Sequence, residues 1–306
     1  MTNDRGRRPD ARVLAKFGLA AKDALHQVFH ENTKLGALTA RAYSAWIMGF
    51  NRAHALQARE QEKVYSLGET RALPRVEAST ELERCISARR STRRFSGAPL
   101  GLEALARLLF FTYGRTDPRG LFRAVPSGGA LYPLELYVLA LRVEGLEPGV
   151  YHYGVGAGEL DVVRPGVGLA ELKAVINWQG VDIDNACLAL IFGASFLRTT
   201  EKYRDRGYRM VLMEAGEAAQ NLGLLAASMG LGACLLGGFN DDRLSELLDV
   251  DGVDEAPLLP VLLGWPAPPD VAKDPTEPMP LRLAEPGRAP VAAATARGPA
   301  DKGGTT

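Results

Sequence analysis

Hydrophobic positions follow two kinds of pattern along this chain. Five stretches place apolar residues three or four positions apart, as a helix with a buried face does: residues 9–30, 36–60, 80–89, 101–112 and 208–230. Six shorter stretches carry apolar runs or alternations typical of strands: residues 135–143, 149–155, 159–165, 188–195, 233–239 and 258–265. The helix predicted over 208–230 is apolar nearly all round, which is typical of a buried helix.

The predicted helices and strands do not alternate regularly, so we expect an α+β fold rather than a doubly wound sheet. Residues 64–78 contain glycine and proline and suit a linker, and the polar run at 198–207 predicts a charged loop. From residue 284 the composition is typical of disorder. We therefore expect a helical N-terminal extension, a main domain and a disordered tail, with the bounds 1–78, 79–283 and 284–306.

Composition narrows the class of protein. The 306 residues are 46% hydrophobic, which is ample for a large core. Lysine plus arginine and aspartate plus glutamate both number 36, which argues against a nucleic-acid or membrane-surface partner. No run of 18 apolar residues and no secretory h-region occurs, so we expect a cytoplasmic protein. The three cysteines lie far apart without metal-ligand spacing, so no metal site or disulfide framework is expected.

Four arginines surround a serine in the segment RRSTRRF, residues 89–95. Arginine presents a planar fork of donors that matches phosphate oxygens, and Ser91 adds a short donor. Because the whole chain carries no net charge, the cluster is a local feature. It predicts a phosphate site, although a solvated basic turn fits the same residues.

A loop of small residues, VPSGGALYP, spans residues 125–133. Gly128 and Gly129 permit positive φ and close approach of the backbone to a ligand, and successive N–H groups can form an anion or carbonyl site. The spacing matches neither a Rossmann turn nor a P-loop. The loop therefore suits a cradle for a flat cofactor, and an ordinary connection into the next strand is the alternative.

Three further groups could carry chemistry. In LLGGF, residues 235–239, a backbone N–H at Gly237 or Gly238 could face N5 of an isoalloxazine, or the glycines could simply end a strand. Glu214, Gln220 and Asn221 need partners if the helix buries them, and otherwise face solvent. In Lys202-Tyr203 the lysine could stabilise a phenolate base or act as the base itself, and a solvated loop is the alternative.

The motifs occur in a fixed order: RRSTRRF, VPSGGALYP, EKYRDRGYR, EAGEAAQNLGLLAASMGLGACLLGGF and LPVLLGWP. With FHENTKLG ahead of them, they resemble the SagB-type dehydrogenases, a branch of the FMN-dependent nitroreductase superfamily, over roughly residues 28–266. The resemblance implies a nitroreductase-like α+β flavin fold with a mixed or antiparallel central sheet flanked by helices. It also implies an obligate homodimer that binds FMN at the subunit interface, with the helix 208–230 in the dimer core.

The resemblance implies which residues surround FMN. The arginine segment would hold the ribityl phosphate and ring edge, the small-residue loop would line the flavin, and the glycines of LLGGF would approach N5. These residues are Arg89, Arg90, Ser91, Arg93, Pro126, Ser127, Gly128, Gly237 and Gly238, to which we add Gln220 and Asn221. A basic residue near the C-terminus that meets the phosphate has no clear counterpart, and Lys273 is the one candidate we name.

The implied activity is oxidation of thiazolines or oxazolines to azoles in a ribosomally made peptide. Lys202 and Tyr203 match the Lys-Tyr pair associated with that activity, so they are the predicted catalytic residues. The predicted partners are a second copy of the chain, a peptide substrate and a cyclase complex. Two other functions fit the sequence: an NAD(P)H-dependent FMN reductase of nitro, quinone or other small molecules, and a non-catalytic scaffold.

Overall fold

The computed structural model describes residues 25–36, 39, 43, 63, 71–176 and 180–268. All of them belong to one compact unit, residues 1–269. Its helices are α2 (Leu25–Thr33), α5 (Glu81–Ala88), α6 (Leu102–Tyr113), the 3-10 turn η1 (Gly128–Ala130), α7 (Leu169–Val175), α8 (Leu197–Tyr203), α9 (Asp205–Ser228) and α10 (Asp241–Leu248). Its strands are β1 (Leu134–Ala140), β2 (Gly149–Gly154), β3 (Glu159–Pro165), β4 (Leu188–Ser195), β5 (Gly232–Leu235) and β6 (Glu255–Gly264).

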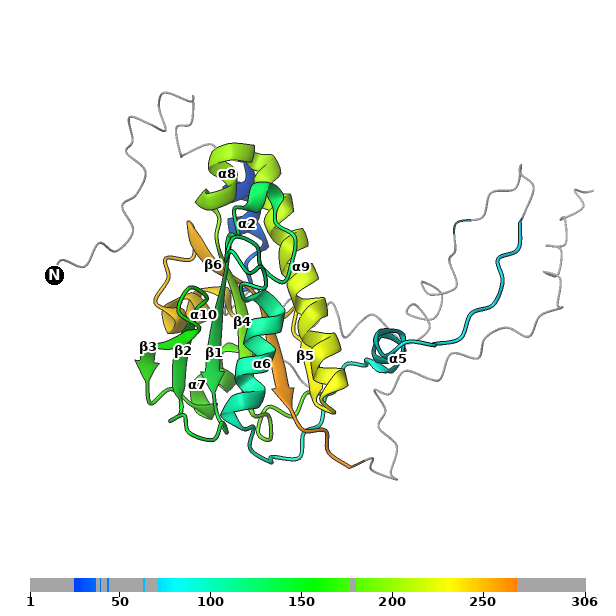
Figure 1. The fold of residues 1–306 in the computed structure, drawn as a ribbon. Coiled ribbons are helices and arrows are strands. Elements are labelled where there is room, and N and C mark those ends of the chain that lie inside the picture. The colour runs from blue at the N-terminus through cyan, green and yellow to red at the C-terminus, as the bar shows by residue number, and fades with distance from the viewer. Residues whose placement is uncertain are drawn as a thin grey trace, which may run out of the picture. The chain divides into compact units, whose positions relative to one another are not determined.

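The strands form one six-stranded sheet in the order β3-β2-β1-β4-β6-β5, and every neighbouring pair is antiparallel. Helices α6 and α9 pack on one face, and α7 and α10 on the other (Figure 1). Along β1, for example, Leu136 and Val138 join the α6–α9 core, whereas Tyr137 and Leu139 join the core under α7 and α10. Because both faces are covered, the central strands read as continuous apolar runs. The predicted α+β fold is confirmed.

The strand predictions match the structure to within a few residues, but one loop prediction was wrong and two helices were missed. Residues 198–207 are not a loop but most of α8 and the start of α9. That segment is helical because Thr199 and Thr200 are buried on one side, which polar composition alone conceals. Helices α7 and α10 were not predicted, because they are short and mainly polar.

The long helix α9 is not buried all round. Its inner face packs under the sheet, but Leu212 and Met213 on its outer side are exposed in the single chain. The apolar composition of this segment predicted the helix correctly. Composition alone could not show which apolar side chains pack in the core and which lie on the surface. Gln220 lies on the exposed side, Asn221 is half-buried, and Glu214 is buried.

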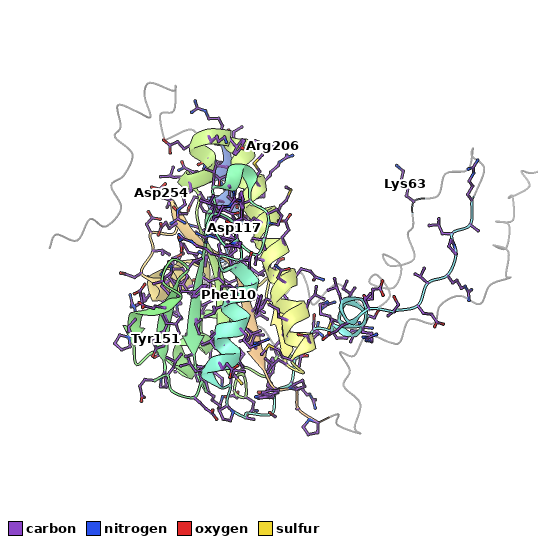
Figure 2. All side chains as sticks on the ribbon, in the orientation of Figure 1. Lys63, Phe110, Asp117, Tyr151, Arg206 and Asp254 are labelled. Atoms are coloured by element: carbon purple, nitrogen blue, oxygen red, sulfur yellow. The ribbon has the colours of Figure 1, made fainter. Side chains whose placement is uncertain are left out.

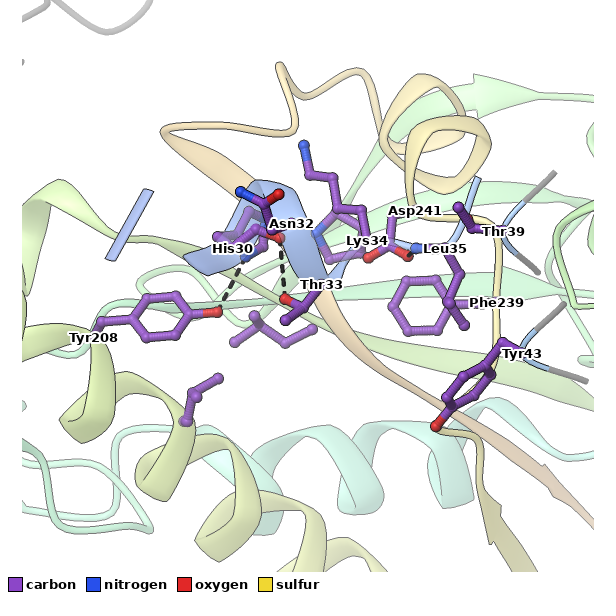
Figure 3. Close-up of a pocket in the computed structure, with 14 residues that line it drawn as sticks. His30, Asn32, Thr33, Lys34, Leu35, Thr39, Tyr43, Tyr208, Phe239 and Asp241 are labelled. Atoms are coloured by element: carbon purple, nitrogen blue, oxygen red, sulfur yellow. Dashed lines mark hydrogen bonds between the residues drawn. The ribbon is translucent and has the colours of Figure 1, made fainter. Parts of the chain in front are cut away.

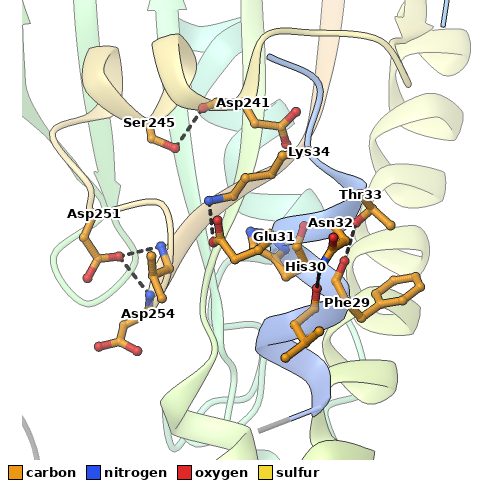
Figure 4. Close-up of polar contacts among 12 residues, drawn as sticks. Phe29, His30, Glu31, Asn32, Thr33, Lys34, Asp241, Ser245, Asp251 and Asp254 are labelled. Carbon is orange, nitrogen blue, oxygen red and sulfur yellow. Dashed lines mark hydrogen bonds and ion pairs between the residues drawn. The ribbon is translucent and has the colours of Figure 1, made fainter. Parts of the chain in front are cut away.

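The segment around α2 packs against the start of α9. His26 pairs with Asp205 at 2.8 Å, and buried His30 contacts the Tyr208 hydroxyl at 3.1 Å through Nδ1. Beyond α2, Lys34 pairs with Glu31 (Figure 4). The Leu35 amide donates to the Asp241 carboxylate at 2.9 Å. Most of the two N-terminal predicted helices, and the predicted tail 284–306, lie outside the described residues.

None of the helices within the described ranges is long and apolar enough to cross a membrane.

Candidate functional site

The small-residue loop has an unusual backbone. Gly129 has φ of 69°, and the non-glycine residues Ala130 and Tyr132 have φ of 54° and 48°. Each left-handed non-glycine residue costs roughly 1–2 kcal/mol, so the surroundings must hold this conformation. The Tyr132 amide donates to Ser127 Oγ at 2.9 Å, and the Tyr132 hydroxyl accepts from the Arg123 amide at 3.1 Å. Strain of this kind is typical of ligand-binding and catalytic sites.

Glu214, a buried carboxylate of α9, holds the loop through hydrogen bonds. Glu214 Oε1 accepts from the Tyr113 hydroxyl at 2.6 Å, and that hydroxyl accepts from the Leu134 amide at 3.1 Å. Glu214 also shares a hydrogen bond with Ser127. Burial raises the pKa of Glu214, and burial beside this carboxylate raises the pKa of Tyr113. The prediction that Glu214 would need a partner if buried is therefore confirmed, and its partner is the loop.

The predicted catalytic pair lies against the same loop. A Cβ built at Gly129 would stand 2.7 Å from Tyr203 Oη and 2.8 Å from Lys202 Nζ, so both head groups reach the glycine backbone. The Lys202 ammonium lies 5.0 Å from the centre of the Tyr203 ring. Two motifs that are far apart in sequence thus meet at one point, because α8 delivers Lys202 and Tyr203 at its last turn.

Pro126, Gln220 and Asn221 line one open cavity of about 600 Å³ at the outer face of α9. Asn221 Nδ2 donates to the Ala124 carbonyl at 3.2 Å, so this side chain anchors the start of the loop. Gly128 lies against Met210 of α9. All three predicted residues of the loop are therefore placed beside α9, together with Gln220 and Asn221.

The arginine segment runs past the edge strand β5. Ser91 forms a parallel bridge with Ala233, and the Thr92 amide donates to the Ala233 carbonyl at 2.9 Å. Arg89, which ends α5, lies against α9 at Gly223. Arg90 is exposed, and the positive charge of half-buried Arg93 acts on the Cys234 thiol. Ser91 and Arg93 therefore lie at β5, whereas Arg89 lies against α9 and the Arg90 guanidinium donates to the carbonyls of Ser87 and Arg89.

Gly237, which follows β5, lines a second cavity of about 720 Å³. Figure 3 shows this cavity. Nothing lies within 4 Å of a Cβ built at Gly237, and Gly238 is half-buried. The remaining wall includes His30, Lys34 and Asp241 from the α2 segment and α10. Burial lowers the pKa of His30 and raises the pKa of Asp241. Lys273 lies outside the described residues.

A model of the Nitroreductase family matches residues 86–265. The chain belongs to this family. MJ1384 of Methanocaldococcus jannaschii, which is named as a nitroreductase, is 41% identical over 197 residues, covering 63% of this chain and 94% of that protein. The microcin B17-processing protein McbC of Escherichia coli is 31% identical over 169 residues, covering 54% of this chain and 62% of McbC. The chain thus spans less than two thirds of McbC.

A solved structure shows the same fold. One chain of the E. coli microcin synthetase McbBCD complex with truncated pro-MccB17 bound matches with a TM-score of 0.63 and 24% identity. The match covers 87% of this chain and 100% of that one. The nitroreductase-like architecture expected from the motifs is therefore confirmed.

Sequence reasoning missed several residues of this nitroreductase-family site. Tyr113, Arg123, Glu135 and Arg198 lie around the loop and stand in no motif with a recognisable spacing. Tyr132 lies within the loop motif but was not predicted as a site residue. Arg123 stacks on two rings, 4.6 Å from the centre of Tyr113 and 5.0 Å from that of Tyr132. An available signal was Tyr132, the one tyrosine of the loop, since a large residue between the two glycines and Pro133 must itself be packed.

Proposed function

We propose that this chain is a SagB-type, FMN-dependent dehydrogenase that oxidises thiazolines or oxazolines to azoles in a ribosomally made peptide. The observation that carries the proposal is the meeting of Lys202 and Tyr203 with the loop at Gly129. A proton acceptor at that loop is what this oxidation needs beyond the hydride acceptor. The precursor peptide and a cyclase would be its partners, in the cytoplasm.

The residues present fit FMN. Arg89, Arg90 and Arg93 offer forked cationic donors for a phosphate, and Ser91 offers a hydroxyl. Gly237 is exposed and has open space beside its Cα, so a flat ring could approach its backbone. The cavity beside Pro126, Gln220 and Asn221 lies within the size range of ligand pockets, about 300–1,000 Å³. When bound, FMN would supply the acceptor for the hydride, with dioxygen as the final oxidant.

The proton that the azoline ring loses would be accepted by side chains of this protein. Conversion of an azoline to an azole breaks two C–H bonds of the ring, and one hydrogen leaves as a proton. Lys202 Nζ or Tyr203 Oη takes that proton, because the two groups lie side by side and face the loop. Gly129 permits their approach, and Glu214 with Tyr113 holds Ser127 so that the loop keeps its shape.

The relatives support a peptide substrate. McbC processes microcin B17, and the matched solved complex holds a truncated pro-microcin. By analogy, a precursor peptide that already carries azoline rings is the substrate class we propose here.

Replacing Lys202 with alanine tests the assignment. The Lys202→Ala protein should keep its bound FMN and lose azole formation by at least about 100-fold, a general-base effect. The measurement is mass spectrometry of an azoline-containing peptide, with flavin absorbance recorded on the same sample. Arg206→Ala is the matched control, because Arg206 is an exposed cation near the pair, at the start of α9 (Figure 2). Full activity of Lys202→Ala would remove Lys202 from the mechanism.

A second function is favoured by the 41% identity to MJ1384, which is named as a nitroreductase. An NAD(P)H-dependent reductase would bleach its flavin rapidly on addition of NADPH without any peptide. The dehydrogenase should instead bleach with the azoline peptide. A purified protein that stays colourless after incubation with FMN would point to a scaffold instead.

A further inference from the structure

Helix α8 touches the loop 125–133 at both of its ends. At its last turn, Lys202 and Tyr203 reach Gly129. At its first turn, Arg198 Nη1 donates to the carbonyl of Tyr132 at 3.3 Å. Arg198 and Lys202 stand four positions apart, so they lie on the same face of the helix. That face is therefore the one turned toward the loop.

Arg198 also ties α8 to the sheet. Its Nη2 atom forms an ion pair with Glu135 Oε1 of β1. Both terminal nitrogens of one planar guanidinium are thus engaged, one by the loop and one by the sheet. A fork of this kind fixes the direction of the side chain as well as its distance, which a single ammonium does not do.

The acceptor of this ion pair is itself held in place. Glu135 Oε2 lies 2.8 Å from His152 Nε2 of β2, and His152 Nδ1 lies 3.7 Å from Asp161 of β3. The Glu135 side chain is only 16% exposed, whereas that of Arg198 is 41% exposed. Arg198 therefore extends from the helix to a fixed carboxylate, and the carboxylate does not depend on Arg198 for its position.

The backbone is strained both in the loop that Arg198 contacts and at the end of the helix that carries it. Tyr132 has φ of 48°, and Arg204, which follows Tyr203, has φ of 54° with ψ of −148°. Conformations of this kind cost on the order of 1–3 kcal/mol each and persist where neighbours hold them. The hydrogen bond from Arg198 to Tyr132 links the strained loop to the helix that ends at the strained Arg204.

From these contacts we infer that Arg198 is a positioning residue, which fixes Lys202 and Tyr203 against the loop by joining α8 to the Tyr132 carbonyl and to Glu135. The inference rests on the proposed function for the role of Lys202 and Tyr203, but the geometry that it assigns to Arg198 does not. Arg198 itself need not touch a substrate or a cofactor.

The test compares Arg198→Ala and Arg198→Lys with the wild-type flavoprotein. In Arg198→Ala, kcat for azole formation should fall on the order of tenfold or more, with FMN content and KM for the peptide within about twofold. Arg198→Lys should restore only part of the loss, because an ammonium does not reproduce the fork. With tyrosine labelled by ¹³C at the hydroxyl-bearing carbon, the NMR signal of Tyr203, assigned by its loss in Tyr203→Phe, should shift or broaden in Arg198→Ala.

The controls separate positioning from general stability. Arg119→Ala breaks an ion pair with Asp117 elsewhere on the surface and should change neither kcat nor the Tyr203 signal. If Arg198→Ala fails to fold, Glu135→Gln removes the ion pair with little change of shape and should move the signal in the same direction. An unmoved Tyr203 signal with unchanged kcat would overturn the inference, as would loss of FMN in step with activity. Because the NMR signal needs no substrate, it reports on Arg198 even if azolines are not the substrate.

Discussion

At the scale of single residues, the site depends on a glycine, whose lack of a side chain leaves room for two neighbouring groups. Gly129 is the point at which Lys202 and Tyr203 approach the loop, and it has a positive φ. Any larger residue would meet two obstacles there, backbone strain and the head groups of Lys202 and Tyr203, the proposed catalytic pair. The effect of backbone strain can be measured separately from the steric effect, because other glycines of this chain have a similar φ and no neighbouring atoms around a Cβ built there.

Gly129→Ala should impair catalysis more than it impairs stability. Its Cβ would stand 2.7 Å from Tyr203 Oη and 2.8 Å from Lys202 Nζ, so both groups must move. Gly158→Ala is the matched control, since Gly158 has φ of 72° against 69° and nothing within 4 Å. Both variants should lose roughly 1–2 kcal/mol in the free energy of unfolding, measured by urea denaturation. Only Gly129→Ala should lose azole formation, and equal turnover in the two variants would contradict the arrangement.

Single residues also show what sequence reasoning could reach. Lys202-Tyr203 and Gly128-Gly129 could be reached because they stand in motifs whose order along the chain resembles that of a known family. Arg198 and Glu135 do not, because each is an ordinary charged residue until folding brings β1 and α8 together. A contact between distant charged residues leaves no periodicity or spacing in the chain, so only the structure reveals it.

At the scale of elements, the sheet was predictable and its connections were less so. Strands β1, β4 and β6 are largely buried on both faces, so they are mainly apolar runs, with Glu135 as an exception in β1. Helix α8 is short and charged, and its two buried threonines give no helical signal. The element that carries the predicted catalytic pair was therefore the one that patterning assigned to a loop.

Strands β1 and β2 are joined across one face by the pair of Glu135 and His152. The hydrogen bond to Glu135 raises the pKa of His152 above 6.5. Contacts with His152 and Arg198 outweigh burial and hold the pKa of Glu135 below 4.5. The histidine therefore stabilises the fold fully below pH 6.5, and the carboxylate does so above pH 4.5. The pair of Glu135 and His152 therefore makes its full contribution to the free energy of unfolding only between pH 4.5 and pH 6.5.

His152→Asn should accordingly destabilise the protein more at pH 6 than at pH 9. As the pH rises through the raised pKa of His152, the wild-type protein loses the charged form and with it the advantage over the variant. Urea unfolding of both proteins at the two pH values measures the difference. A gap that widens toward pH 9 would show that the ion pair is not what His152 contributes.

At the scale of the whole molecule, α9 shows a covered face and an open face. The open face includes Met213, which is 61% exposed, beside the cavity lined by Pro126 and Gln220. A large apolar side chain exposed beside a cavity is typical of an interaction surface. We propose that a second copy of the chain covers it, as the family resemblance implies.

A charge on that face should therefore separate the subunits. Met213→Arg should shift the mass in sedimentation analysis from dimer toward monomer and lower the FMN content. Val162→Arg is the control, because Val162 on β3 is exposed to the same 61% but lies at the opposite edge of the sheet from β5. A wild-type protein that sediments as a monomer with full FMN would exclude an interface site.

The order of the sheet has a consequence for how the protein is made. β6, the last strand of the described chain, lies between β4 and β5 and is the strand to which β5 pairs within the sheet. During synthesis, β5 therefore has no strand neighbour until residues 255–264 have left the ribosome. The arginine segment bridges to β5 at Ala233. Until β6 has been synthesised, this segment therefore has no ordered strand to pair with. A nascent chain that lacks β6 should not capture the proposed FMN, so that flavin loading would be a late event that reports completion of the sheet.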